Sequence, residues 1–80
     1  MKEGKGLVKE YFDGTLRFEG AYLNGERNGK GKEYDDYEGE LLFVFEGEYL
    51  NGKRHGKGKE YDYAGKVVFE GEYLNEERIL

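Results

Sequence analysis

The sequence contains no cysteine, proline, tryptophan or serine, and it has one histidine and one threonine. Without cysteine, the chain can form no disulfide, thiolate nucleophile or cysteine-ligated zinc site. Without serine, and with Thr15 in an expected turn, covalent catalysis has no hydroxyl nucleophile to activate. A single histidine also excludes most histidine-based metal sites and acid–base pairs. We therefore expect a protein that is not an enzyme and that binds no metal and no cofactor.

Long apolar runs and excess positive charge are missing as well. No stretch approaches the roughly 18 apolar residues that span a membrane. Residues 1–6 contain no apolar run of the kind found in signal peptides. Thirteen basic and 18 acidic residues give a net charge of −5, which argues against nucleic-acid binding driven by counterion release. We expect a soluble, cytoplasmic protein that does not bind nucleic acid.

The 80 residues suffice for one small domain. A charged fraction of 39% and a hydrophobic fraction of 36% are too polar for a thick two-layer core. An aromatic fraction of 16% is nevertheless too high for ordinary disorder. The composition therefore indicates a thin fold that is stabilised by aromatic rings.

Two sequence blocks recur along the chain. The block Phe-Glu-Gly-x-Tyr-Leu-Asn, followed by Gly or Glu, occupies residues 18–25, 45–52 and 69–76. The block Gly-Lys-Gly-Lys-Glu-Tyr-Asp follows the first two copies, at residues 29–35 and 56–62. No linker or shift in composition divides the chain, so we expect a single repeat domain over residues 1–80.

A degraded copy of the second block opens the chain. We interpret Leu7-Val8 as an insertion between Gly4-Lys5-Gly6 and Lys9-Glu10-Tyr11. The order is then half repeat, full repeat, full repeat and half repeat. The expected boundaries are 4–14, 15–40, 41–65 and 66–80.

Residues of the first block alternate with a period of two, which is typical of β-strands. The faces that carry the aromatic rings are predicted to consist of Leu16, Phe18, Gly20 and Tyr22; of Leu41, Phe43, Phe45, Gly47 and Tyr49; and of Val67, Phe69, Gly71 and Tyr73. The glycines in mid-strand leave room for rings to lie across the backbone. On the other face, Glu and Lys of neighbouring strands are predicted to pair, as with Glu46 and Lys59.

We place strands near residues 7–12, 15–23, 30–35, 41–50, 57–62 and 66–74. Asp13-Gly14 reads as a two-residue hairpin turn. Asn24-Gly25 and Asn51-Gly52 are expected to open six-residue loops that close at Gly29 and Gly56. Asp36 to Gly39 and Ala64-Gly65 form the return turns. The predicted fold is all-β: a single twisted antiparallel β-meander of about six strands built from repeated hairpins.

Tyr61 does not fit strict alternation, because Lys57 and Lys59 would send it to the charged face. Either a bulge near Glu60 resets the register, or Tyr61 lies on that face. We favour the bulge.

Residues 45–52, followed by Gly56-Lys57-Gly58, resemble the membrane occupation and recognition nexus repeat, usually called MORN. That family's pattern is aromatic-x-Gly-x-aromatic, then Asn-Gly, then Gly-x-Gly and an aromatic strand. Residues 16–74 carry the pattern, with departures at Glu60, in the long segment 38–44, and at Asn75-Glu76 in place of Asn-Gly. The resemblance implies β-hairpins stacked into an elongated, grooved sheet that serves as a scaffold or binding module. Lipid-headgroup binding has been proposed for some members.

Three isolated signals have a simpler structural interpretation. His55 lies in an expected loop, at a position where the preceding repeat has Asn28. The acidic run that begins at Asp35 lacks the ligand spacing of a calcium-binding loop. Glu46 and Glu48 are repeated in the last copy, whereas a glycosidase has one catalytic pair.

We expect a non-catalytic scaffold that binds a protein or peptide along an aromatic groove or a sheet edge. The predicted contact residues are Phe18, Tyr22, Phe45, Tyr49, Phe69 and Tyr73. One alternative is a membrane-surface adaptor that binds anionic phospholipid through basic loops. Its predicted contacts are Arg27, Lys30, Lys53, Arg54 and Lys57. Another alternative is a self-assembling or engineered structural repeat with no native ligand, for example a homodimer through edge strands or the aromatic face.

Overall fold

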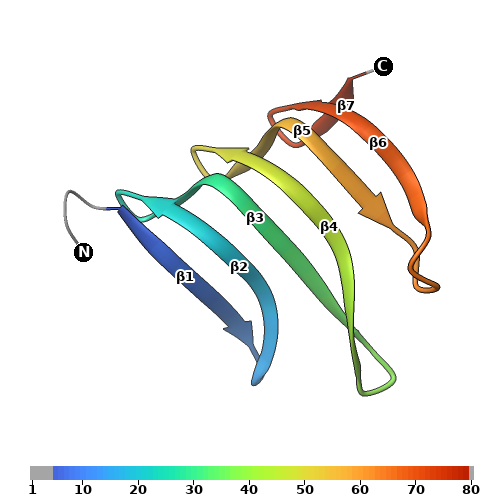
Figure 1. The fold of residues 1–80 in the computed structure, drawn as a ribbon. Helices are drawn as coiled ribbons and strands as arrows, with labels where there is room; N and C mark the ends of the chain where they lie inside the picture. The colour runs from blue at the N-terminus through green and yellow to red at the C-terminus, as the bar shows by residue number, and fades with distance from the viewer. Residues whose placement is uncertain (1–4, 80) are drawn as a thin grey trace.

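The computed structural model describes residues 5–79, which form a single antiparallel sheet (Figure 1). Its seven strands are β1 (Lys5–Phe12), β2 (Thr15–Leu23), β3 (Glu26–Tyr37), β4 (Glu40–Leu50), β5 (Lys53–Tyr61), β6 (Val67–Leu74) and β7 (Glu77–Ile79). Their order in space follows their order in the sequence. The predicted all-β meander of consecutive hairpins is therefore confirmed. Gly4 and Leu80, which belong to the two predicted half repeats, lie outside the described residues.

The sheet is one layer thick. All seven strands belong to this one sheet, and the described part of the molecule measures 39 × 35 × 13 Å. The strands bend along their length, so the sheet is curved rather than flat (Figure 1). None of the described residues belongs to a helix long and apolar enough to cross a membrane.

Tight turns join most of the strands and correct two predictions. In Asn51-Gly52 both residues have positive φ, at 50° and 84°, as a type I′ hairpin turn requires. The expected six-residue loops are therefore wrong, since β3 begins at Glu26 and β5 at Lys53. Asn75-Glu76 makes the same turn and leads into β7, a strand that the sequence analysis missed.

The pairing of β1 corrects the interpretation of the N-terminal half repeat. Val8 lies opposite Gly20 of β2, just as Gly31 of β3 lies opposite Gly47 of β4. Val8 thus holds the position that Gly31 holds in β3. Leu7-Val8 is a substitution within the repeat and not an insertion.

One extra residue in each of β2, β4 and β6 shifts the strand register and moves side chains between the faces. The extra residue in β6 is Val68, because Glu60 pairs with Phe69 while Tyr61 pairs with Val67. Tyr61 therefore stays on the charged face, where its hydroxyl donates to Glu46 at 2.6 Å. The predicted bulge near Glu60 lies instead in the facing strand.

The same bulges correct four of the predicted face assignments. Four residues that we expected among the aromatic core lie on the charged face: Leu16, Leu41, Phe43 and Val67. Phe43, for example, pairs with Tyr34, and its ring lies 5.7 Å from the ammonium group of Lys32. The rings of Tyr34, Phe43 and Tyr61 pack together on this face.

Candidate functional site

The six aromatic residues predicted as partner contacts form the core of the sheet. Phe18 and Phe45 are completely buried, and Tyr49 and Tyr73 are 4% and 2% exposed. Phe45 makes edge-to-face contacts with Tyr49 and Tyr73, with ring centroids 5.8 and 5.4 Å apart. Tyr22 and Phe69 pack against this cluster and are partly buried. A partner has no access to Phe18 or Phe45 while the sheet keeps this conformation.

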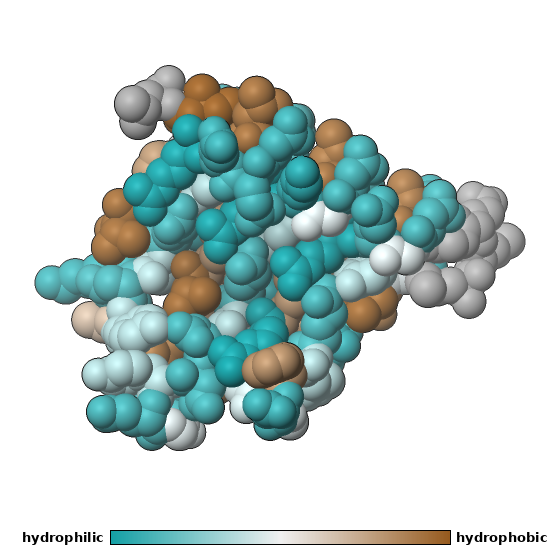
Figure 2. Space-filling view, turned by 180° about the vertical axis from the view of Figure 1, so that it is seen from behind, coloured by the Kyte–Doolittle hydropathy of each residue, from teal (hydrophilic) through white to brown (hydrophobic). Residues whose placement is uncertain are grey.

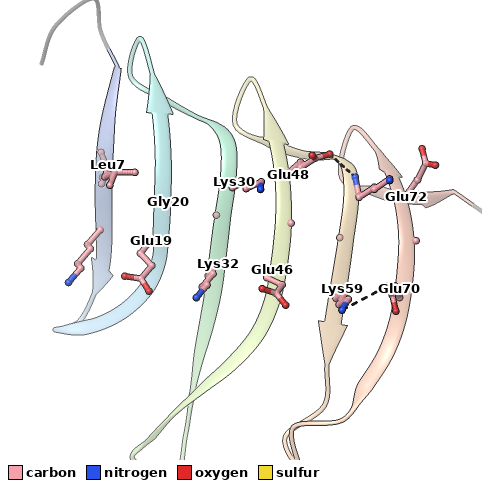
Figure 3. A pocket seen from close by; sticks show the side chains of 17 residues that line it. Leu7, Glu19, Gly20, Lys30, Lys32, Glu46, Glu48, Lys59, Glu70 and Glu72 are labelled. Carbon is pink, nitrogen blue, oxygen red and sulfur yellow. Dashed lines mark hydrogen bonds and ion pairs between the residues drawn. The ribbon is translucent and has the colours of Figure 1, made fainter.

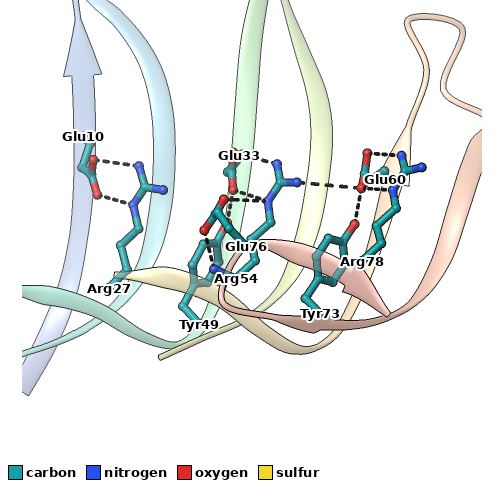
Figure 4. A network of polar contacts seen from close by, with 9 residues as sticks. All are labelled: Glu10, Arg27, Glu33, Tyr49, Arg54, Glu60, Tyr73, Glu76 and Arg78. Carbon is teal, nitrogen blue, oxygen red and sulfur yellow. Dashed lines mark hydrogen bonds and ion pairs between the residues drawn. The ribbon is translucent and has the colours of Figure 1, made fainter. Parts of the chain in front are cut away.

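Arginine side chains cover the rings in place of a second layer. The guanidinium of Arg27 lies 4.2 Å from the ring centroid of Phe18, and that of Arg54 lies 4.0 Å from Phe45. Arg54 also donates two hydrogen bonds to the carboxylate of Glu33, at 2.9 and 3.0 Å (Figure 4). Arg27 binds Glu10 in the same way.

Tyrosine hydroxyls complete each of these polar clusters. Tyr49 donates to Glu33 at 2.5 Å, and Tyr73 donates to Glu60, which Arg78 also binds (Figure 4). Burial of Glu33 opposes its ionisation, but the hydrogen bonds from Arg54 and Tyr49 outweigh burial and lower its pKa. The hydrogen bond from Arg78, assisted by that from Tyr73, lowers the pKa of Glu60 to about 2. The charges of these three arginine–glutamate clusters are therefore engaged within the chain.

The five residues predicted to contact lipid do not form one patch. Arg27 and Arg54 lie on the aromatic face in the ion pairs described above. Lys30 and Lys57 lie on the opposite face, and Lys53 is the exposed first residue of β5. The basic loops expected to present these residues are strands.

A row of glycines runs across the sheet, perpendicular to the strands. Each glycine pairs with the glycine of the next strand, in the order Gly20, Gly31, Gly47, Gly58 and Gly71. A Cβ on Gly31 would lie 2.6 Å from the ring of Phe18, and one on Gly58 would lie 2.7 Å from that of Phe45. The predicted role of mid-strand glycines in ring packing is confirmed.

An open groove of about 1070 Å³ follows this row on the charged face (Figure 3). Its floor is the backbone of the glycine row, and its walls are the side chains on either side. One wall consists of Lys9, Glu19, Lys32, Glu46, Lys59 and Glu70. The other consists of Leu7, Lys30, Glu48, Lys57 and Glu72. Seen from behind the view of Figure 1, hydrophilic residues cover most of the surface (Figure 2).

The groove charges alternate in sign from strand to strand and are only lightly paired. The cross-strand placement of Glu and Lys predicted from the sequence is confirmed, since Glu46 lies directly opposite both Lys32 and Lys59. Within residues 5–79, the only salt bridge between side chains of the groove walls joins Lys59 and Glu70 at 3.9 Å. The alternating Lys and Glu of the sequence were a signal for this groove, whereas the predicted groove lay among the aromatic rings.

The remaining candidate residues have structural surroundings. His55 lies in β5 rather than in a loop, and its buried Nδ1 has no hydrogen-bond partner within the described part of the chain. Asp35 accepts hydrogen bonds from Arg17 at 3.0 Å and from Tyr63 at 2.5 Å. Glu46 and Glu48 are wall residues of the groove.

The model of the MORN repeat family matches residues 18–36 and 45–67. These segments cover most of the β2–β3 and β4–β5 hairpins and just over half of the chain. Comparison with curated proteins and with solved structures gave no match.

Proposed function

Because this chain belongs to the MORN repeat family, whose repeats are generally protein- or membrane-interaction modules, we propose that it is a non-catalytic module that binds a protein partner in the Lys/Glu groove. The observation that carries the proposal is the contrast between the two faces. Arg27, Arg54 and Arg78 are bound to carboxylates on the aromatic face. Most of the groove charges are exposed and can pair with a ligand.

The shape of the groove suits an extended segment of a partner. Wall residues on one strand, such as Lys57 and Lys59, are two positions apart, which corresponds to roughly 7 Å. This spacing sets the width of the groove, which is narrower than the roughly 10 Å diameter of an α-helix with its side chains. The six strands from β1 to β6 are about 24 Å wide in total, which is enough for about seven extended residues.

The alternating charges favour a peptide of mixed charge over an anionic membrane. Lys57 and Lys59 lie between the glutamates of β4 and those of β6. The positive potential of each lysine pair is therefore reduced by its neighbours. A peptide that carries both signs can match both stripes, whereas a uniformly anionic surface would be repelled by the glutamates.

Selection from a random peptide library, followed by titration calorimetry, tests the proposal. We expect selected peptides to carry both Lys and Glu. The double variant Lys32→Glu/Lys59→Glu should weaken binding by about tenfold or more, because it replaces attraction by repulsion. Lys53→Glu/Lys66→Glu makes the same charge change outside the groove and should leave the affinity unchanged.

The outcomes separate the candidate surfaces. Restored affinity on reversing the peptide's matching charges would support direct contact with the groove. Equal affinity of the groove variant and its control would contradict the proposal. Co-sedimentation with anionic vesicles that both double variants weaken equally would favour the membrane-adaptor function instead.

A further inference from the structure

The last repeat leaves part of β6 without a neighbour. β7 pairs only with Glu72, Tyr73 and Leu74 of β6. The rest of that strand, Val67–Gly71, pairs with β5 on one side and with no strand on the other within residues 5–79. Backbone groups on such an edge can pair with another extended chain.

Phe69 shows what this edge lacks. The equivalent Phe18 and Phe45 lie across a glycine of the next strand, Gly31 and Gly58 respectively, and are completely buried. Phe69 is only partly buried, although Arg78 lies 4.6 Å from its ring centroid. An added strand would complete the burial of this ring.

We propose that Val67–Gly71 is a strand-addition site for an extended Lys-Gly-Lys-Glu-Tyr segment of a protein partner, bound antiparallel to β6. The pairing of β4 with β5 defines the register, because Gly47 lies opposite Gly58, Glu46 opposite Lys59, and Phe45 opposite Glu60. In the added strand, the glycine lies opposite Gly71, the second lysine opposite Glu70, and the glutamate opposite Phe69.

Charge complementarity supports this ligand. Lys59 and Glu70 already form a salt bridge at 3.9 Å on the inner side of β6, and an incoming lysine approaches Glu70 from the outer side. The incoming glutamate takes the position relative to Arg78 that Glu60 takes relative to Arg54, whose Nη1 lies 3.8 Å from the Glu60 carboxylate. The second lysine and the glutamate of the ligand therefore each meet a group of opposite sign.

Steric fit makes the glycine essential and disfavours a second copy of this chain as the ligand. A Cβ at Gly58 would lie 2.7 Å from the ring of Phe45, and Phe69 imposes the same limit on the strand added beside it. β1 is the opposite edge strand, but it carries Val8 at the glycine position. Addition of β1 would drive the valine side chain into the ring of Phe69.

A capped peptide with the sequence of residues 57–63 provides the test, monitored by NMR titration against the full chain. We expect its binding to shift the backbone amides of Val67–Gly71 and to protect alternate amides of β6 from exchange. The same peptide with Gly58→Val should bind about tenfold more weakly or less well still, because the added side chain overlaps Phe69. A chain variant Glu70→Lys should lose affinity for the peptide and regain it when Lys59 of the peptide is replaced by glutamate.

The strand-addition site shares Glu70 and Gly71 with the groove, and Val67, Val68 and Phe69 lie outside it. Shifts at Gly31, Gly47 and the groove walls, with none at Val67, Val68 or Phe69, would support the proposed function and overturn strand addition. Equal binding of the glycine and valine peptides would refute the register. Absence of any shift in residues 67–71 at millimolar peptide, in a chain that is folded by the same spectra, would refute the site itself.

Discussion

Gly58 and Gly71 lie in the same row of the sheet but meet different surroundings. A Cβ at Gly58 would lie within 2.8 Å of two atoms of the Phe45 ring, which is completely buried. A Cβ at Gly71 would meet one atom of the Phe69 ring at 2.9 Å, and that ring is only partly buried. We expect Gly58→Ala to destabilise the fold by about 2–3 kcal/mol and Gly71→Ala by about 1 kcal/mol or less. Urea denaturation of the two variants measures the difference.

Both variants replace glycine by alanine, so the conformational entropy of the unfolded chain falls by the same amount in each. Equal losses of stability in the two variants would contradict the packing role of the glycine row. Val8 is consistent with that role, because it holds the equivalent position in β1, while the rings of Phe18 and Phe45 lie across Gly31 of β3 and Gly58 of β5.

Glu76 holds a backbone conformation that suits glycine. Its φ is +81°, where Gly25 and Gly52 of the equivalent turns have +84°. Its carboxylate accepts a hydrogen bond from the backbone amide of Arg54 at 2.7 Å, which partly offsets the strain. We expect Glu76→Gly to be more stable than Glu76→Ala by about 1 kcal/mol, because both lose this contact but only glycine relieves the positive φ.

Thermal unfolding of both variants in one buffer checks this expectation. A Glu76→Ala variant as stable as Glu76→Gly would show that the turn imposes no strain at this position. The comparison does not depend on the strength of the contact with Arg54, since both variants lack it.

At the scale of the strands, every second strand supplies a carboxylate that binds an arginine lying over the aromatic rings. Glu10 of β1, Glu33 of β3 and Glu60 of β5 all have lowered pKa values, and that of Glu60 falls from 4.5 to about 2. A folded-state pKa below the unfolded value stabilises the fold above pH 4.5, and this stability is lost as the pH falls toward 2. We therefore expect the free energy of unfolding, from urea titrations, to decrease steadily over that interval.

The Glu60→Gln variant removes the contribution of one carboxylate to the pH dependence of the free energy of unfolding. The variant should be less stable at neutral pH, because the ion pair with Arg78 at 2.8 Å is lost, and its stability should depend less steeply on pH below 4.5. Glu38→Gln, at an exposed turn, is the control and should keep the full pH dependence. An unchanged slope in Glu60→Gln would show that other groups control acid unfolding.

Element types were predictable because period-two alternation and the Asn-Gly turns are local signals. The register was not predictable, because the extra residues of β2, β4 and β6 depend on pairing with other strands. The extra residue of β4 is Val44, because Glu33 pairs with Phe45 while Tyr34 pairs with Phe43. Its neighbour Phe43 packs against Tyr34 and Tyr61, and this packing requires three strands to be in place. No window of the sequence contains that information.

The site was predicted only in part, for a related reason. Alternation showed that Glu46 and Lys59 share a face, and that face was confirmed. It did not show which face is hollowed, since the curvature of the sheet arises from bulges and ring packing along every strand. The arginines were missed as core residues because Arg27 and Arg54 were assigned to loops, and no local signal placed their guanidinium groups over rings.

At the scale of the whole molecule, the aromatic face of the sheet is covered although the described residues form no second layer on it. Its buried apolar core is limited to four residues among those described: Phe18, Phe45, Tyr49 and Tyr73. Arginine covers the rings with a flat, cationic surface, and the glutamates neutralise it, so that the aromatic face is shielded without a packed partner. The opposite face carries the alternating Lys and Glu side chains of the groove.

Within residues 5–79 the outer sides of β1 and of Val67–Gly71 pair with no strand, so Val8 bears on whether two copies can associate through these edges. If β1 of one copy were added to β6 of another, Lys9 would lie opposite Glu70 and the alternation of charge would continue across the junction. In that register the Val8 side chain would occupy the space of the Phe69 ring, as a Cβ at Gly58 would overlap the ring of Phe45. We expect the wild-type chain to remain monomeric over a concentration series in size-exclusion chromatography with light scattering, and Val8→Gly to form head-to-tail oligomers.

Val8→Ala is the matched control and should stay monomeric, because a Cβ at this position still meets the ring. Oligomers of the wild type, or a monomeric Val8→Gly chain, would show that Val8 does not control association at these edges.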